Sequence, residues 1–152
     1  MSVIFSRSCE YALQAVMYIA MQPRNQMVLL KEVAEKVNIP KHFLGKILQK
    51  LAKSGLLDSQ KGPNGGFALY ETPNKITALM IVEAIDGLDL VNKCVAGFPE
   101  CHREDPCPFH EDWAHIRNNI KEMLEKETVE KLMQDAKEGK RIPFLKPGYL
   151  TK

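Results

Sequence analysis

The segment Leu29–Lys53, LLKEVAEKVNIPKHFLGKILQKLAK, decides the fold. It predicts a short helix over Leu29–Val37, a break at 38–40, and a second helix over Lys41–Lys53 that ends before Gly55. In the second helix the apolar residues recur at intervals of three and four, which predicts one buried stripe: Phe43, Leu44, Ile47, Leu48 and Leu51. The opposite face is basic and polar. Two helices joined by a tight turn, the second with one apolar and one basic side, are the outline of a helix-turn-helix.

A predicted β-hairpin follows the two helices. Two short extended runs, Leu56–Gln60 and Phe67–Tyr70, flank the sequence KGPNGG at 61–66. Its glycines suit a hairpin tip in which the backbone adopts positive φ. A helix-turn-helix followed by a hairpin is the order of a winged helix. The expected fold class is therefore mainly α, a winged helix-turn-helix with a small β-hairpin wing and a long C-terminal dimerisation helix.

Four more helices are predicted outside this segment. They span Ser8–Met21, Thr77–Asp86, His110 to about Lys126, and Val129–Lys137, the last capped by Thr128. The helix that begins at His110 has one apolar line, formed by Trp113, Ile116, Ile120, Met123 and Leu124. No other element of the chain is wide enough to cover this line, so we expect a homodimer in which a second copy covers it.

The chain of 152 residues, 45% of them apolar, fits one globular domain, or one domain plus an appended helix, and leaves no room for a large multi-domain enzyme. We divide it into a DNA-binding winged helix at 1–86, a cysteine-rich loop at 87–109, dimerisation helices at 110–138 and an irregular tail at 139–152. The longest apolar run, Ala15–Met21, is far too short to cross a membrane, and the first residues lack a signal-peptide pattern. We expect a cytoplasmic protein with no membrane partner.

Positive charge concentrates in the first part of the chain. Residues 1–86 include ten basic and seven acidic residues, a net charge of +3, whereas residues 87–152 have a net charge of −1. The segment from Pro40 to Lys61 contains five lysines and only one acidic residue. A helix with Lys46 and Lys50 one turn apart can lie in the major groove of double-stranded DNA, with Lys61 at the hairpin tip reaching phosphate or the minor groove. The predicted DNA-binding residues are Lys41, His42, Phe43, Lys46, Lys50, Lys61 and Asn64.

Three cysteines and a histidine form the second group with a chemical signature. Cys94, Cys101 and Cys107 lie on a stretch without periodicity, and His110 begins the next predicted helix. A loop can turn several thiolates inward toward one soft-metal centre. This spacing alone does not separate zinc from an iron–sulfur cluster, because three cysteines and one histidine are also a zinc ligand set. The fourth cysteine, Cys9, is interpreted as a helix residue.

A thiol redox enzyme is not supported. The sequence has no Cys-x-x-Cys pair and no thioredoxin-like βαβ pattern. We therefore expect no enzymatic activity and no small-molecule substrate.

The chain as a whole resembles the Rrf-type winged-helix regulators, over roughly residues 3 to 135. The resemblance rests on FSRSCEYAL at 5–13, the helix-turn-helix at 30–51, KGPNGGF at 61–67 and the three-cysteine loop. It implies a homodimeric transcription factor with one iron–sulfur cluster per subunit on Cys94, Cys101 and Cys107. Cluster state would control binding to a palindromic operator in response to iron, redox state or nitric oxide. The resemblance favours iron over zinc; the alternative is a zinc-stabilised winged-helix protein that binds DNA without sensing.

The resemblance leaves two choices for the fourth ligand. His110 and Trp113 complete a Cys-x2-His-x2-Trp pattern, which implies a [2Fe–2S] cluster held by three thiolates and one imidazole. Glu10 stands where nitric-oxide-sensing members place a carboxylate donated by the other subunit. We favour His110, with Glu10 as the alternative ligand and [4Fe–4S] as the alternative cluster. We also expect the cysteine loop to lie between the wing and the dimerisation helices, so that cluster state shifts the spacing of the two DNA-binding heads.

Overall fold

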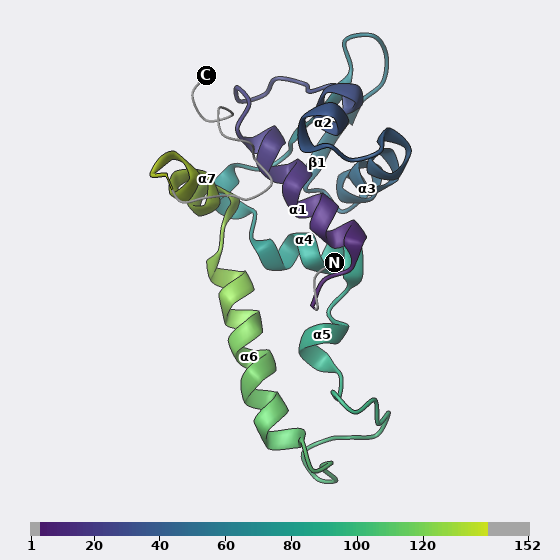
Figure 1. Cartoon of the computed structure of the whole chain (residues 1–152), viewed down its shortest axis with the longest axis vertical. Helices are drawn as coiled ribbons and strands as arrows, with labels where there is room; N and C mark the ends of the chain where they lie inside the picture. Colours follow the sequence, from purple (N-terminus) through teal and green to yellow (C-terminus); the bar gives the residue numbers. More distant parts are fainter. Residues whose placement is uncertain (1–3, 140–152) are drawn as a thin grey trace.

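The computed structural model describes residues 4–139, and within them seven α-helices, one short 3-10 helix and a two-stranded antiparallel hairpin (Figure 1). The helices before the hairpin are α1 (Arg7–Ala20), α2 (Leu30–Val37) and α3 (Lys41–Lys53), and the strands are β1 (Leu57–Gln60) and β2 (Gly66–Leu69). The helices after it are η1 (Pro73–Lys75), α4 (Ala78–Asp86), α5 (Asp89–Asn92), α6 (His110–Lys126) and α7 (Val129–Lys137). The structure thus confirms the predicted winged helix-turn-helix order.

The helix-turn-helix is formed by α2 and α3. Asn38 adopts the left-handed conformation, with φ of 59°, and reverses the chain between the two helices. Leu44, Leu48 and Leu51 of α3 are fully buried against α1 and α2. The prediction that Phe43 belongs to the same stripe is wrong, because its side chain is 53% exposed. Adjacent helix positions are about 100° apart, so Leu44 faces the core and Phe43 faces solvent.

The wing is the hairpin of β1, β2 and the connecting residues 61–65. Leu57 pairs with Leu69 and Gln60 with Gly66. The hairpin also joins the loop before α2, because Val28 and Phe67 exchange two backbone hydrogen bonds of 2.8 Å. Gly66 has a φ of 135°, and a Cβ at this position would lie 2.2 Å from the carbonyl oxygen of Val28. Glycine at this position therefore lets the wing lie directly against the domain.

Gly66→Ala is expected to destabilise the domain by about 2 kcal/mol or more, because both the strained φ and the collision with Val28 must be relieved. Gly62→Ala is the matched control. Gly62 also has a positive φ, of 101°, but its added Cβ would meet nothing within 4 Å. Urea denaturation of both variants separates the two costs. An equal loss of stability in the two variants would contradict the role assigned to the close approach of Gly66.

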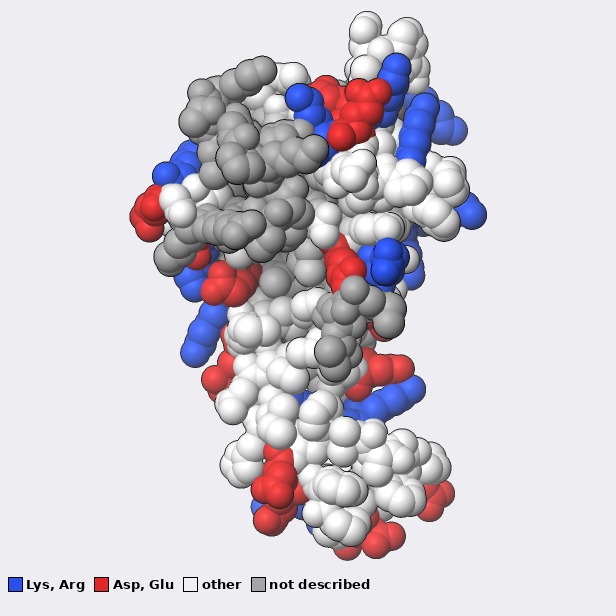
Figure 2. All heavy atoms as spheres, in the orientation of Figure 1, with Lys and Arg blue, Asp and Glu red and all other residues white. Residues whose placement is uncertain are grey.

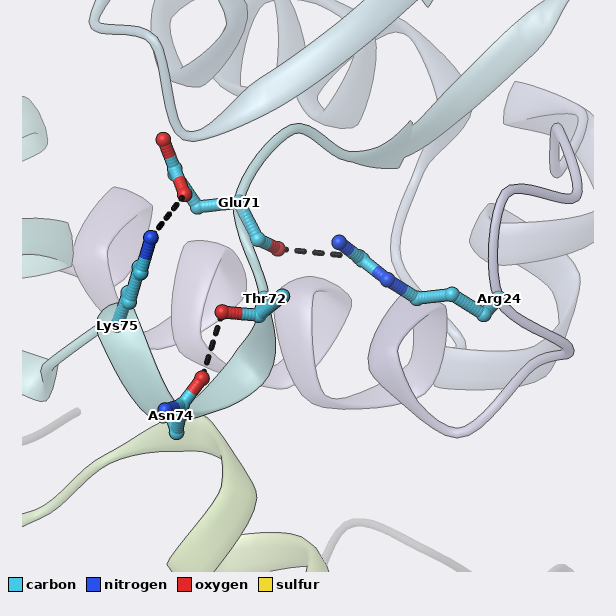
Figure 3. Close-up of polar contacts among 5 residues, drawn as sticks. All are labelled: Arg24, Glu71, Thr72, Asn74 and Lys75. Carbon is cyan, nitrogen blue, oxygen red and sulfur yellow. Dashed lines mark hydrogen bonds and ion pairs between the residues drawn. The ribbon is translucent and has the colours of Figure 1, made fainter.

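A polar turn connects the wing to α4 (Figure 3). Arg24, in the loop after α1, donates a hydrogen bond of 3.0 Å to the carbonyl oxygen of Glu71. The carboxylate of Glu71 forms an ion pair of 3.7 Å with Lys75, and the hydroxyl of Thr72 contacts the Asn74 side chain at 2.6 Å. These contacts tie η1 to the end of α1.

The start of α4 is joined to the junction between α6 and α7. The Ala78 N–H donates to the Glu127 carbonyl and the Val129 N–H donates to the Ile76 carbonyl, both at 2.8 Å. Thr77 and Thr128 cap α4 and α7 through their hydroxyl groups, as expected from the sequence for Thr128. Thus α7 returns to pack on α1, while α6 extends away from the winged helix (Figure 1). The long helix α6 is therefore followed by a shorter one rather than ending the described chain.

The segment that contains the cysteines differs from expectation in two ways. It begins with a four-residue helix, α5, in part of a region predicted to be irregular. The expectation that the cysteine loop lies between the wing and the dimerisation helices is wrong. The loop lies at the opposite end of the longest axis of the molecule from the wing, where α5 leads into the loop and α6 leaves it (Figure 1). Of the predicted tail, residues 140–152 fall outside the described range. Within residues 4–139, no helix has the length and apolar character needed to span a membrane.

Candidate metal centre and DNA interface

The loop between α5 and α6 brings three cysteine side chains together. The sulfur atoms of Cys94, Cys101 and Cys107 all lie within 4.8 Å of one another, and each residue is partly exposed. The Cys94 and Cys107 sulfurs are 3.6 Å apart. Two thiolates on one tetrahedral metal ion at bonds of about 2.3 Å would lie about 3.8 Å apart. This pair is therefore already spaced as two ligands of a single ion.

His110 lies beside Cys101. Its Nδ1 atom lies 3.3 Å from the Cys101 sulfur, and the Cys107 N–H donates to that same sulfur at 3.5 Å. His110 is the first residue of α6, so the helix start fixes its position next to the loop. It is not a member of the group in which all donors lie within 4.8 Å. The three sulfurs thus form one mutually close group, and His110 contacts this group at Cys101.

The loop environment favours the thiolate form at Cys94. Desolvation acts to raise its pKa, but hydrogen bonds from the backbone of Phe98 and Ala96 and from the neighbouring thiols lower the pKa of Cys94 to about 7. Desolvation, with the neighbouring thiols, raises the pKa of Cys107. Because the thiolate is the form that binds metal, Cys94 is prepared to act as a ligand near neutral pH.

Side chains of α6 hold the entrance of the loop. The Trp113 indole N–H donates a 2.9 Å hydrogen bond to the carbonyl oxygen of Lys93, the residue before Cys94. Arg117 reaches the carbonyl oxygen of Asn92 at 3.4 Å. A cavity of about 390 Å³ opens beside the loop and is lined by Cys101, Cys107 and neighbouring prolines. The sequence indicated Trp113 as part of a pattern, but gave no sign that Arg117 would fix the loop.

The two remaining predicted residues of this group lie on α1. Glu10 is partly buried in the first turn of α1 and is not part of the cysteine group within one chain. Cys9 is fully buried, and this burial, together with the nearby Asp86, raises the pKa of its thiol to about 12. Its environment agrees with the interpretation of Cys9 as a helix residue, since a buried neutral thiol is unreactive.

The residues predicted to contact DNA lie on α3 and on the wing. All seven are exposed: Lys41, His42, Phe43, Lys46 and Lys50 on α3, and Lys61 and Asn64 in the wing. The rings of His42 and Phe43 lie against each other, with centroids 4.2 Å apart. The Gln49 side chain contacts Ser59 of β1 at 3.4 Å, which ties α3 to the wing. Figure 2 shows lysine and arginine side chains along the upper right edge, where Figure 1 places α2, α3 and the wing.

One of these lysines has an intramolecular partner. The Lys50 ammonium group donates a 2.9 Å hydrogen bond to the carbonyl oxygen of Ile85, near the end of α4. The next residue, Asp86, accepts two hydrogen bonds from Ser6, one from its backbone N–H at 2.9 Å and one from its hydroxyl. Ser6 precedes α1 and carries the N-cap signal of a serine at a helix start, but nothing in the sequence indicated Asp86 as its partner.

Known proteins share both sequence and fold with this chain. A family described as "Rrf2: Iron-dependent Transcriptional regulator" matches residues 5–135. A helix-turn-helix-type transcriptional regulator of Aquifex aeolicus is 33% identical over 133 residues, covering 86% of this chain and 92% of that protein. The regulator IscR of Photobacterium profundum is 30% identical over 125 residues, covering 82% of this chain and 72% of that protein.

Two solved structures share the fold. CymR, the global cysteine regulator of B. subtilis, has a TM-score of 0.73 at 26% identity, covering 88% of this chain and 98% of that one. The T. potens IscR structure has a TM-score of 0.74 at 24% identity, covering 100% of this chain and 97% of that one.

Proposed function

The chain belongs to the Rrf2 family of transcriptional regulators, and we propose that it binds operator DNA as a homodimer under the control of an iron–sulfur cluster. Because regulators of transcription act on DNA, we also propose that the protein is cytoplasmic and is not an enzyme. The finer proposal is that cluster state alters operator affinity, with iron supply, redox state or nitric oxide as the signal. When bound, a cluster supplies a centre that responds to oxidants, to electrons and to iron supply.

The observation that carries this proposal is the gathering of three cysteine sulfurs, all within 4.8 Å of one another, on one loop beside His110. The Cys94 and Cys107 sulfurs are 3.6 Å apart, and the Nδ1 atom of His110 lies 3.3 Å from the Cys101 sulfur. In a [2Fe–2S] cluster each iron takes two protein ligands, whereas in a [4Fe–4S] cluster each iron takes one. We propose [2Fe–2S] with His110 as the fourth ligand, because the Nδ1 atom of His110 lies beside the Cys101 sulfur whereas Glu10 lies outside the cysteine group; the sulfurs would separate to hold two irons.

The same arrangement keeps a single zinc ion as the alternative. One tetrahedral ion would need all four donors to be mutually close, at separations of about 3.5 to 4 Å. His110 stands outside the group in which every donor lies within 4.8 Å of the others. A zinc site on these four residues would thus require His110 to move toward Cys94 and Cys107, whereas a cluster would require the sulfurs to move apart.

Dimerisation is proposed from the surface of α6. The expectation that no element of the chain covers the apolar line of this helix is wrong for Leu124, which is buried against α4 of the same chain. Ile116 and Met123 are each half exposed. A second copy that packs against α6 would cover the two exposed side chains. It would also place two α3 helices on one DNA duplex, and a two-fold symmetric protein predicts a palindromic operator.

For the DNA contact itself we propose α3 in the major groove and the wing beside it. The residues proposed to contact DNA are Lys41, His42, Phe43 and Lys46 from α3, with Lys61 and Asn64 from the wing. All of them are exposed on the part of the molecule where basic side chains gather. Lysine contacts to phosphate supply affinity without sequence information, so base reading falls to the other residues.

Anaerobic purification of the wild type, followed by visible absorption and by iron, sulfide and zinc analysis, tests this function. We expect equal iron and sulfide contents. His110→Ala should change the cluster spectrum, because an imidazole ligand raises the potential and alters the electronic structure of the iron it binds. Glu10→Ala is the matched variant for the alternative ligand and should leave the spectrum unchanged.

Three other outcomes would each overturn a different part of the proposal. A spectrum altered by Glu10→Ala alone would reassign the fourth ligand to the partner subunit. A spectrum typical of [4Fe–4S] would overturn the cluster type. A colourless protein with one zinc per chain would leave a DNA-binding regulator and remove the sensor.

A further inference from the structure

The cysteine loop and the wing lie at opposite ends of the molecule, so any influence of one on the other must pass through the elements between them (Figure 1). The chain enters the loop from α4 through Gly87 and α5. The end of α4 is therefore the part of the winged helix that is closest along the chain to Cys94.

Lys50 connects this end of α4 to α3. Its ammonium group donates to the carbonyl oxygen of Ile85, the penultimate residue of α4, at 2.9 Å. Carbonyl groups in the last turn of a helix lack partners within the helix and carry the negative end of its dipole, so a cation is favourable there. Lys50 is thus held on α4 by its position, whereas Lys46, one turn earlier, is exposed and has no hydrogen bond or ion pair among the described residues.

The path from the end of α4 to Cys94 is fixed by further contacts. Asp86 is bound to Ser6 at the start of α1, and Gly87, with φ of 76°, turns the chain into α5. The Lys93 carbonyl, one residue before Cys94, is held by Trp113 of α6. These contacts therefore hold both ends of the segment 87–93, which joins the end of α4 to Cys94.

We infer that Lys50 is a positioning residue that couples the cysteine loop to α3, through its hydrogen bond to the end of α4, rather than a phosphate contact. This inference rests on the proposed function, because it names the link by which cluster state changes the placement of α3. Movement of the loop pulls on the Ile85 carbonyl, and Lys50 passes the displacement to the helix that reads DNA.

The test measures operator Kd against salt concentration for cluster-loaded and cluster-free protein. Lys50→Met keeps the length of the side chain and removes the donor, and Lys46→Met is the matched control one turn away on the same face. For the wild type we expect the two Kd values to differ at least fivefold, the lower end of common allosteric couplings of about 5- to 150-fold. Lys50→Met should bring this ratio within about twofold of unity and leave the salt slope unchanged.

Lys46→Met should behave in the opposite way. It should lower the salt slope by about 0.9 in both states and preserve the ratio between them. Thermal unfolding of each variant checks that both remain folded. If Lys50→Met preserves the ratio and lowers the slope, Lys50 is a phosphate contact and the inference is overturned. A wild-type ratio of one would overturn the proposed cluster control itself, and the inference with it.

Discussion

Cys107→Ala is expected to leave the purified protein with less than about a tenth of the wild-type iron and sulfide, since even residues that only support metal ligands change affinity 10- to 100-fold. Cys107 contacts both of the other cysteines in the loop. Its sulfur lies 3.6 Å from that of Cys94, and its N–H donates to the sulfur of Cys101. Removing the thiol leaves Cys94 without the partner with which we propose that it shares an iron ion. Iron and sulfide analysis after anaerobic purification measures the loss.

The operator affinity of Cys107→Ala should equal that of wild-type protein from which the cluster has been removed. Cys9→Ser is the control, because it also removes one thiol but lies on α1, buried beside Asp86. We expect Cys9→Ser to retain the full cluster content. A Cys107→Ala protein with wild-type iron and sulfide would contradict the ligand assignment. Equal losses in both variants would show that cluster retention depends on the fold rather than on the loop.

Helix bounds could be predicted from the sequence wherever a chemical signal for the end stands in the chain. The predicted bounds of α3 and α7 agree with the structure, because Pro40 and Thr128 stand at their starts and Gly55 follows α3. Proline and threonine at a helix start act through the local backbone, so tertiary packing does not have to be known. The predicted span of α6, from His110 to about Lys126, also agrees, since its apolar line continues over this whole length.

Phe43 shows where periodicity failed. Phe43 and Leu44 are adjacent apolar residues, and either could have begun a stripe that continues at Ile47 and Leu48. The choice between them depends on how α3 is rotated against α1 and α2, which is a property of the packed core. The exposure of Phe43 fits its other predicted role, as a residue that contacts DNA.

The placement of the cysteine loop could not be predicted for a related reason. The spacing of Cys94, Cys101 and Cys107 identifies donors, and the structure does bring their sulfurs together. Spacing contains no information about which end of the molecule the loop occupies. That is decided by α5, which at four residues is too short to show periodicity, and by contacts from α6 to backbone carbonyl groups of Asn92 and Lys93.

Lys50 illustrates the limit of charge patterns. A lysine on the polar face of a helix can neutralise a phosphate or donate to a carbonyl group of its own chain, and the sequence around it is the same in both cases. In the structure Lys50 donates to a carbonyl group of its own chain, that of Ile85. Lys46 is exposed and remains able to contact a phosphate. The charge pattern indicates which side of the domain we expect to bind DNA, but assigning a role to each lysine needed the position of α4.

The double variant Lys46→Ala and Lys61→Ala is expected to weaken operator binding about 60-fold at 0.1 M salt and to lower the salt slope by about 1.8. Each proposed phosphate contact releases close to one condensed counterion, which is worth nearly tenfold in affinity at this salt concentration. Lys46 lies on the exposed face of α3 and Lys61 at the start of the wing loop, so one variant tests both parts of the proposed interface. Operator Kd measured from 50 to 300 mM salt, roughly the range in which the slope is well defined, gives both values.

The double variant Lys75→Ala and Lys137→Ala is the control for charge alone. It also removes two positive charges, but from η1 and α7, which lie on the other side of the winged helix from α3 (Figure 1). Lys75 pairs with Glu71 at the surface, where such pairs contribute at most about 1 kcal/mol, so the fold should persist. Counterion release requires a cation at the phosphate itself, whereas a distant charge acts only through a field that is screened within about 10 Å at 0.1 M salt. The control should therefore keep the wild-type slope, and an equal loss of slope in both double variants would mean that α3 and the wing are not the surface that meets DNA.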